Sequence, residues 1–301
     1  MQIPEDLSEK ILRVHDARGQ QWLEQLPDLI SYSRKRWSLK LGQPFANLSY
    51  NLVLAATDSD GADLVLKLGV PCPELLTEMS ALKLFRGIGA VNLLDYDALR
   101  GIILMERVVP GTPIHEMHSD LEAARTAATL MRQLWRCPPA NHPFPSLAIW
   151  FRAFDRLRNR FAGGTGPFPA KLIEKAERTF ADLNASTDRS VILHGDLHHT
   201  NILFSCKRGW LAIDPKGICG DAGYEVGPFM MNQLPAGASE SVMLETLAQR
   251  LSVFSDELNV SRERLAQWSF CHAVLSALWD FEESAEWRST MKLAETLAHL
   301  R

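Results

Sequence analysis

The chain has 301 residues, of which 46% are hydrophobic and 23% charged, and its formal net charge is −4. This length and apolar content allow a sizeable buried core and are sufficient for two lobes. The acidic balance lacks the basic surplus of nucleic-acid-binding proteins, and no apolar run approaches the length of a membrane span. We therefore expect a globular protein with neither nucleic acid nor membrane as a partner.

The cysteines and the N-terminus predict a cytoplasmic location. The opening residues lack the basic start, apolar centre and small-residue cleavage site of a signal peptide. The five cysteines are scattered without the paired spacing of a zinc site, which favours reduced thiols. They are Cys72, Cys137, Cys206, Cys219 and Cys271. We expect a monomer or a weak dimer.

The first third of the chain predicts two helices followed by a small sheet. Apolar residues recur at helical spacing over residues 7–37, with breaks at Gly19 and Pro27. One further helix is predicted at residues 73–85. Short strand-like runs are predicted at residues 37–41, 52–56, 64–68, 91–94 and 102–105.

After the segment VVPGT, residues 108–112, the pattern becomes mainly helical. Helices are predicted at residues 121–135, 147–161, 171–183, 239–254, 262–283 and 285–300. The sequence therefore predicts an α+β protein of two lobes. The N-lobe, residues 1–107, has a small sheet and added N-terminal helices, and the C-lobe, residues 108–301, is mainly helical.

One polar segment interrupts the helical half. In VILHGDLHHTNILF, residues 191–204, a loop containing Asp196 and Asn201 lies between two short apolar strands. Asp214 stands in a second strand and turn, LAIDPKG, a little further along the chain. An acid on one loop, with an amide and a second acid from two adjacent strands, supplies the oxygen ligands that magnesium ions carrying a nucleotide phosphate require.

HGDLHHTN followed by IDPKG resembles the catalytic loop and metal-binding turn of the aminoglycoside phosphotransferases, a branch of the protein-kinase-like fold. The kinase pattern H-x-D-x-x-x-x-N is matched by His194, Asp196 and Asn201. Residues 194–225 are especially similar to the branch of streptomycin 6-kinases and hydroxyurea phosphotransferases. That branch has a second histidine, a Gly-Trp before the aspartate and a Tyr-Glu after the turn. The matching residues are His199, Gly209, Trp210, Tyr224 and Glu225.

The resemblance implies that Asp196 is the catalytic base and that Asn201 and Asp214 are magnesium ligands, with ATP as the phosphoryl donor. Phosphoryl transfer needs positioning and charge compensation more than covalent work by the protein, which agrees with these roles. We expect the ring of His194 to tie the loop backbone together rather than to move protons. A transition-metal site at His198 and His199 is not expected, because adjacent side chains on an extended segment point in opposite directions.

The resemblance also implies a nucleotide grip in the N-lobe. Lys67 on a strand and Glu78 on the following helix match the lysine–glutamate pair of this fold. The phosphate-covering loop ANLSYN, residues 46–51, lacks the usual glycines, so Ser49 and nearby amides are the expected phosphate contacts. The adenine is expected against backbone groups of Glu106 and Val108.

The acceptor site is less clearly marked. Streptomycin-like acceptors carry guanidinium groups, which carboxylates and aromatic faces bind well. Trp279, Asp280, Glu282 and Glu283 provide both near the end of the chain. The alternative is a solvated acidic helix face with tryptophans in the core. The role of Asp221 and Glu225 is equally open, since they either orient the catalytic loop or touch the substrate.

These residues predict ATP-dependent phosphoryl transfer to a hydroxyl of a small molecule that is cationic or polyhydroxylated. An aminoglycoside of the streptomycin type is the first expectation. The alternatives are another hydroxylated metabolite, hydroxyurea, or an inactive kinase-like binding module. An active enzyme is favoured because an inactive module usually lacks the lysine, a metal ligand or the base, whereas this sequence has all of them. They are Lys67, Asp196, Asn201 and Asp214.

Overall fold

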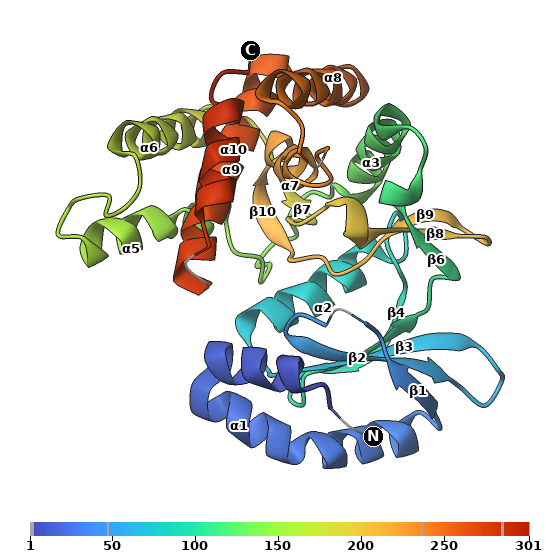
Figure 1. The fold of residues 1–301 in the computed structure, drawn as a ribbon. Coiled ribbons are helices and arrows are strands. Elements are labelled where there is room, and N and C mark those ends of the chain that lie inside the picture. Colours follow the sequence, from blue (N-terminus) through green and yellow to red (C-terminus); the bar gives the residue numbers. More distant parts are fainter. Residues whose placement is uncertain (1–2, 47, 236, 284–285, 301) are drawn as a thin grey trace. The chain divides into compact units, whose positions relative to one another are not determined.

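The computed structural model describes residues 3–46, 48–235, 237–283 and 286–300. The chain divides into two compact units, Met1–Gly111 and Thr112–Arg301 (Figure 1). Within the described ranges, no helix combines the length and the apolar character needed to cross a lipid bilayer. All five cysteines are free thiols.

The first unit contains a five-stranded antiparallel sheet in the order β1-β2-β3-β5-β4. Its strands are β1 (Lys40–Pro44), β2 (Asn51–Thr57), β3 (Asp63–Gly69), β4 (Leu93–Asp97) and β5 (Ile102–Glu106). The first strand begins at Lys40, so the prediction of residues 37–41 was placed too early. Trp37 instead ends the preceding helix, with its backbone N–H donating to the Ser33 carbonyl at 3.2 Å.

The predicted pair of N-terminal helices is present as the two arms of α1 (Glu5–Arg36). The break lies at Asp16, with φ 47° and ψ −129°, and not at Gly19 or Pro27. A Cβ on Gly19 would lie 2.7 Å from the carbonyl oxygen of Ile11. Glycine is therefore needed at position 19 because the two arms approach each other closely there. Pro27 is accommodated inside the second arm.

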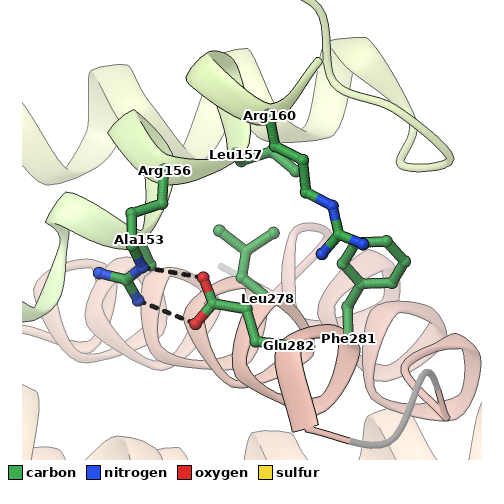
Figure 2. A pocket seen from close by; sticks show the side chains of 7 residues that line it. All are labelled: Ala153, Arg156, Leu157, Arg160, Leu278, Phe281 and Glu282. Atoms are coloured by element: carbon green, nitrogen blue, oxygen red, sulfur yellow. Dashed lines mark hydrogen bonds and ion pairs between the residues drawn. The ribbon is translucent and has the colours of Figure 1, made fainter.

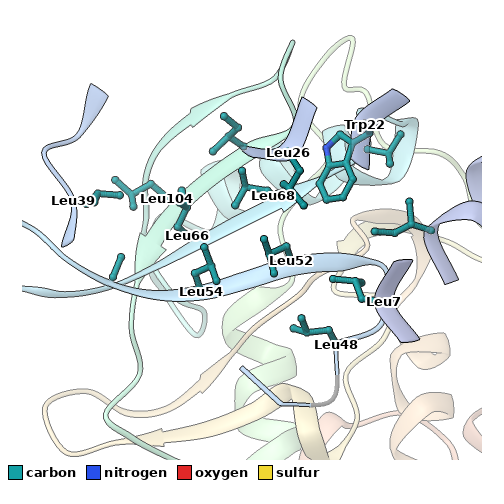
Figure 3. Packing of buried hydrophobic residues seen from close by; sticks show 14 of the residues in the cluster. Leu7, Trp22, Leu26, Leu39, Leu48, Leu52, Leu54, Leu66, Leu68 and Leu104 are labelled. Atoms are coloured by element: carbon teal, nitrogen blue, oxygen red, sulfur yellow. The ribbon is translucent and has the colours of Figure 1, made fainter. Parts of the chain in front are cut away.

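The core of the first unit lies between α1 and one face of the sheet (Figure 3). Leu7, Trp22 and Leu26 of α1 belong to one buried cluster with leucines of β2, β3 and β5. Those leucines are Leu52, Leu54, Leu66, Leu68 and Leu104. Because side chains alternate along a strand, Lys67 points to the opposite face from Leu66 and Leu68. Helix α2 (Pro73–Phe85), which has the predicted bounds, covers that opposite face and pairs with Lys67 there.

The second unit is mainly helical. Its helices are α3 (Asp120–Leu134), α4 (Leu147–Trp150), α5 (Arg152–Arg160), α6 (Ala170–Ala185), α7 (Val226–Met231), α8 (Glu240–Leu258), α9 (Arg262–Glu283) and α10 (Arg288–Leu297). Helix α9 is buried along most of its length because α5, α6, α7, α8 and α10 all pack against it. The helix predicted at residues 147–161 is divided at Phe151, and α7 was not predicted. Ala285, where the last helix was predicted to start, lies outside the described residues.

Two small sheets carry the polar segment. Strands β8 (Ile202–Ser205) and β9 (Gly209–Ala212) form an antiparallel hairpin, and β6 (Pro110–Pro113) is the third strand of their sheet. Strand β7 (Ser190–Leu193) pairs with β10 (Ile218–Asp221). The sequence did not predict strand β10. The loops that join β7 to β8 and β9 to β10 carry the candidate site.

Candidate active site

His194 opens the first of these loops and is completely buried. Its Nε2 lies 2.8 Å from the Ile213 carbonyl oxygen, and its Nδ1 accepts the backbone N–H of Asp196 at 3.2 Å. Burial lowers the pKa of His194 to about 3, so the ring is neutral and its proton lies on Nε2. This bonding confirms the prediction that the ring ties the loop backbone together.

Backbone hydrogen bonds join the two loops. The His194 carbonyl accepts the N–H groups of Lys216 at 2.8 Å and Gly217 at 3.2 Å. The Ile213 N–H donates to the Asn201 carbonyl at 2.9 Å. Since Asn201 immediately precedes β8 and Asp214 closely follows β9, both side chains leave the same end of this hairpin. Asp214 adopts a left-handed φ of 58°, an uncommon backbone geometry that concentrates at functional sites.

The carboxylate of Glu225 holds the backbone of the same loop. It ends a short 3-10 helix, η3 (Ala222–Glu225), and is completely buried. One carboxylate oxygen accepts the N–H of His194 at 2.7 Å, and the other accepts the N–H of Gly195 at 2.8 Å. Glu225 therefore orients the loop, which decides between the two roles considered for it.

Asp221 is also structural. Its carboxylate accepts the Gly223 backbone N–H at 2.7 Å and the Thr187 hydroxyl at 3.0 Å, and it pairs with Arg264 of α9. These partners occupy both carboxylate oxygens. Asp221 thus fixes η3, and through it the position of Glu225.

We expect Glu225→Gln to destabilise the second unit by about 1–3 kcal/mol, because an amide cannot accept both backbone N–H groups. Burial raises the pKa of Glu225 from 4.5 to about 7. Because the folded state holds the proton of this carboxyl more tightly than the unfolded state, protonation favours folding. This contribution is fully present below pH 4.5 and is lost as the pH rises through about 7. The difference in unfolding free energy between wild type and Glu225→Gln should therefore be larger at about pH 5 than at about pH 8. Urea unfolding at both pH values measures it, and an equal difference would contradict the raised pKa.

Asp196 lies between His194 and Asn201 in the loop, with a side chain that is 35% exposed. Its backbone is held at both ends, by His194 Nδ1 at the N–H and by the Asn201 amide, which donates to its carbonyl at 2.9 Å. Its carboxylate Oδ1 lies 3.6 Å from Nε2 of His198. A fixed backbone with a partly exposed carboxylate suits a group that must meet a proton from a bound substrate.

The two adjacent histidines diverge, as predicted. His199 is buried and stacks on Phe229 with ring centroids 3.8 Å apart, whereas His198 faces Asp196 and Asn201. Over the ranges that the structure describes, no cluster of three or more His, Cys, Asp or Glu side chains could hold a metal ion. The divergence of the two rings follows the alternation of side chains along an extended segment.

A magnesium ion fits the chemistry of the donors at the end of the β8–β9 hairpin. Asn201 offers an amide oxygen and Asp214 a carboxylate. Magnesium is usually held by one or two carboxylates, with waters and substrate phosphates completing its octahedral shell. No nitrogen or sulfur ligand is required of the chain.

In the first unit, Lys67 and Glu78 form the predicted pair. Lys67 Nζ lies 2.7 Å from Glu78 Oε1, and both side chains are buried. The contact of this lysine with phosphate remains a prediction. Ser49 is exposed in the bend before β2, and the neighbouring Asn47 lies outside the described residues.

The predicted adenine contacts lie at the end of β5. Glu106 is the last residue of that strand, and its backbone N–H donates to the Asn92 carbonyl at 3.0 Å. Its carboxylate accepts the Asn92 N–H at 2.7 Å, so the side chain fixes this end of the sheet. Val108 follows and is buried. Adenine binding by these backbone groups stays a prediction.

The predicted acceptor residues lie at the C-terminal end of α9. Asp280 accepts the Thr290 hydroxyl at 2.5 Å, and Glu282 pairs with Arg156 through two contacts of 2.9 Å (Figure 2). Trp279 packs edge-on against Trp150 with ring centroids 5.4 Å apart, and Glu283 is exposed.

Glu282 and Arg156 line a cavity of about 70 Å³ between α5 and α9. Its other lining residues are Ala153, Leu157, Arg160, Leu278 and Phe281. Figure 2 shows the Arg160 guanidinium beside the Phe281 ring, 4.7 Å from its centroid. Glu282 and Phe281 therefore hold guanidinium groups of the chain itself, and a cationic acceptor at Glu282 would share or displace Arg156.

The loop that carries Asp196 and Asn201 is bonded to the turn that carries Asp214, and the antiparallel sheet bears a buried lysine–glutamate pair. This combination is typical of phosphotransferases of the protein-kinase-like fold. A sequence profile narrows the class. The profile for aminoglycoside/hydroxyurea antibiotic resistance kinases matches residues 36–284, and the chain belongs to this family. The protein is thus a phosphotransferase whose acceptor is a hydroxyl group of a small molecule.

Individual relatives agree with this placement. The chain is 28% identical over 286 residues to a streptomycin 6-kinase of Streptomyces glaucescens, covering 95% of this chain and 92% of the relative. It is 31% identical over 289 residues to a hydroxyurea phosphotransferase of Kitasatospora aureofaciens, covering 94% and 81%. Among solved structures, a thermostable mutant of an aminoglycoside phosphotransferase in complex with ADP and hygromycin B has a similar fold. The TM-score is 0.60 at 12% identity, covering 90% of this chain and 99% of that chain.

Proposed function

We propose that this protein transfers a phosphoryl group from ATP to a hydroxyl of a streptomycin-type aminoglycoside. The observation that carries the proposal is the bonding of the two loops, which sets Asn201 and Asp214 at one end of one hairpin beside a fixed Asp196. Nucleotide use is further supported by the ADP in the similar aminoglycoside phosphotransferase. The streptomycin 6-kinase relative supports the acceptor.

In this mechanism, Asp196 accepts the proton of the attacking hydroxyl and aligns its oxygen with the transferred phosphorus. Asn201 and Asp214 hold the metal, and Lys67, oriented by Glu78, contacts phosphate oxygens. Magnesium, when bound, offsets the negative charge on those oxygens. The carboxylate of Asp196 suits its role because it is partly exposed, whereas the ring of His194 is buried and both of its nitrogens are engaged with backbone groups.

Hydroxyurea is the second candidate acceptor, since a hydroxyurea phosphotransferase is 31% identical to the chain. Hydroxyurea is small and uncharged, whereas streptomycin carries guanidinium groups. The acidic end of α9 would therefore matter for streptomycin and little for hydroxyurea.

The function is tested by incubating the purified chain with γ-labelled ATP and each acceptor in turn, with magnesium or with EDTA. Phosphorylated streptomycin, identified by mass spectrometry and absent with EDTA, is the expected result. Product from hydroxyurea alone would replace the named acceptor. Failure to transfer label to streptomycin, hydroxyurea or a panel of small hydroxylated metabolites would overturn the proposal.

We expect Glu282→Gln and Asp280→Asn each to raise the KM for streptomycin by about tenfold, the effect of one lost charge-assisted contact. The KM for ATP should stay unchanged. Glu174→Gln, which removes an exposed carboxylate from α6, is the matched control. Steady-state kinetics with each substrate varied in turn provide the test. If both variants keep the wild-type acceptor KM, the end of α9 is a structural feature and not an acceptor wall.

A further inference from the structure

Trp150, the last residue of α4, lies against the loop that carries Asp196. A Cβ on Gly195 would lie 3.0 Å from Cη2 of Trp150, so the edge of the indole contacts the residue immediately before Asp196. The same ring meets Tyr224 edge-on, with centroids 5.9 Å apart. Burial raises the pKa of Tyr224 and the charge of Asp196 adds to this effect, so the Asp196 carboxylate lies within electrostatic reach of Tyr224. Trp150 therefore lies beside the candidate base.

The position of Trp150 is fixed by the contacts of α4 with β10. The Pro145 carbonyl accepts the Cys219 N–H at 2.8 Å just before the helix begins. The Leu147 side chain packs so closely on Gly220 that it leaves no room for a Cβ there. Since β10 pairs with β7, which leads into the loop, the indole is held in place relative to Asp196.

One face of α9 extends this aromatic surface away from the loop. The ring of Trp279 packs edge-on against Trp150, with centroids 5.4 Å apart, and Nδ1 of His272 lies 2.8 Å from the Tyr224 hydroxyl oxygen. His272 and Trp279 are about two helical turns apart and so lie on the same face of α9. Trp268 of this helix is fully buried in the core, whereas Trp150 and Trp279 are only half-buried. These two rings therefore offer apolar surface beside Asp196.

We propose that Trp150 is an acceptor-binding residue, and that its ring contacts a guanidinium group of the acceptor while the reacting hydroxyl lies at Asp196. The inference rests on the proposed function and names a contact of its acceptor site. A hydroxyl that gives its proton to Asp196 lies about 3 Å from the carboxylate, so the rest of the acceptor must cover the groups around it. A guanidinium group is planar and weakly hydrated, and it stacks favourably on an aromatic face.

The decisive comparison is between two substitutions at position 150. Trp150→Leu keeps an apolar side chain but removes the aromatic face, whereas Trp150→Phe keeps a ring. Trp37→Leu removes a half-buried tryptophan at the end of α1 in the first unit and is the matched control. Circular dichroism melting checks that each variant is folded.

Steady-state kinetics of the full chain, with streptomycin and ATP varied in turn, measure the effect on catalysis. Titration calorimetry with streptomycin measures acceptor binding directly. We expect Trp150→Leu to raise both the KM and the Kd for streptomycin by about 10-fold, and Trp150→Phe to keep both within about threefold of wild type. Turnover at saturating streptomycin and the affinity for magnesium AMP-PNP should stay near wild type, because Glu225 and His194, and not the indole, bond to the backbone of Gly195 and Asp196.

An unchanged KM and Kd for streptomycin in Trp150→Leu would overturn the inference and leave the proposed function in place. Equal losses in the Leu and Phe variants would also overturn it, because the aromatic face would then be irrelevant. A joint fall in turnover and in magnesium-nucleotide affinity would show that Trp150 only supports the loop. If the wild-type chain neither binds nor phosphorylates streptomycin, the proposed function fails, and the role of Trp150 fails with it.

Discussion

The turnover number of Asp196→Asn should fall by about two to four orders of magnitude, the usual effect of losing a general base. The amide has the size and shape of the carboxylate but cannot accept a proton from the attacking hydroxyl. The His194 ring and the Asn201 side chain bond to the backbone N–H and carbonyl of residue 196, which the substitution leaves in place. The loop should therefore keep its geometry, and nucleotide affinity should change little.

Single-turnover and steady-state kinetics with the identified acceptor measure this effect, and calorimetry with magnesium AMP-PNP measures the binding. Asp182→Asn, an exposed substitution on α6, controls for the charge change. A variant that keeps near-normal turnover would remove Asp196 from the mechanism. A variant that loses nucleotide binding as well would show that Asp196 contributes to the metal site.

The candidate site was largely predictable because its internal contacts are local. His194, Asp196, His198 and Asn201 bond to one another over separations of five residues or fewer. Such short-range geometry follows from the spacing of the motif itself. Lys67 and Glu78 are only 11 residues apart, on a strand and the helix that follows it, so their pairing was also predictable.

The supporting contacts were not predictable, since they join distant parts of the chain. Glu225 bonds to His194 across 31 residues, and the sequence could assign it to the loop or to the substrate with equal reason. Arg156 reaches Glu282 across 126 residues, so a carboxylate expected to await an acceptor already has an arginine partner. Helix α7 and strand β10 are too short to display a hydrophobic period.

The contact between Arg250 and Asp120 spans 130 residues of the chain. It supports the segment around Phe229, which packs against the loop that carries Asp196. Arg250 is completely buried on α8. Its guanidinium meets the Asp120 carboxylate at 2.6 and 2.9 Å and donates to the carbonyl groups of Phe229, Asn232 and Gln233. The ring of Phe229 in turn stacks on His199, in the loop that carries Asp196 and Asn201.

Asp120→Ala should therefore lower the unfolding free energy of the second unit by about 3 kcal/mol, since it leaves a fully buried guanidinium without its counter-charge. The value lies at the low end of the usual range because the Asp120 side chain is 39% exposed and is replaced in part by water. Asp120 also lies in the first turn of α3, where a negative charge favours the helix dipole by about 0.3–1 kcal/mol.

Glu122→Ala removes an exposed charge from the same turn and so measures the dipole contribution alone. Urea unfolding of both variants isolates the ion pair as the difference between them. A smaller fall in turnover is expected for Asp120→Ala only, because the carbonyl contacts of Arg250 fix Phe229, on which His199 rests. If Asp120→Ala is no less stable than Glu122→Ala, the buried pair contributes nothing beyond the helix dipole. If stability falls while turnover at saturating substrate is unchanged, the loop geometry depends on His194 and Glu225 alone and not on the packing beneath His199.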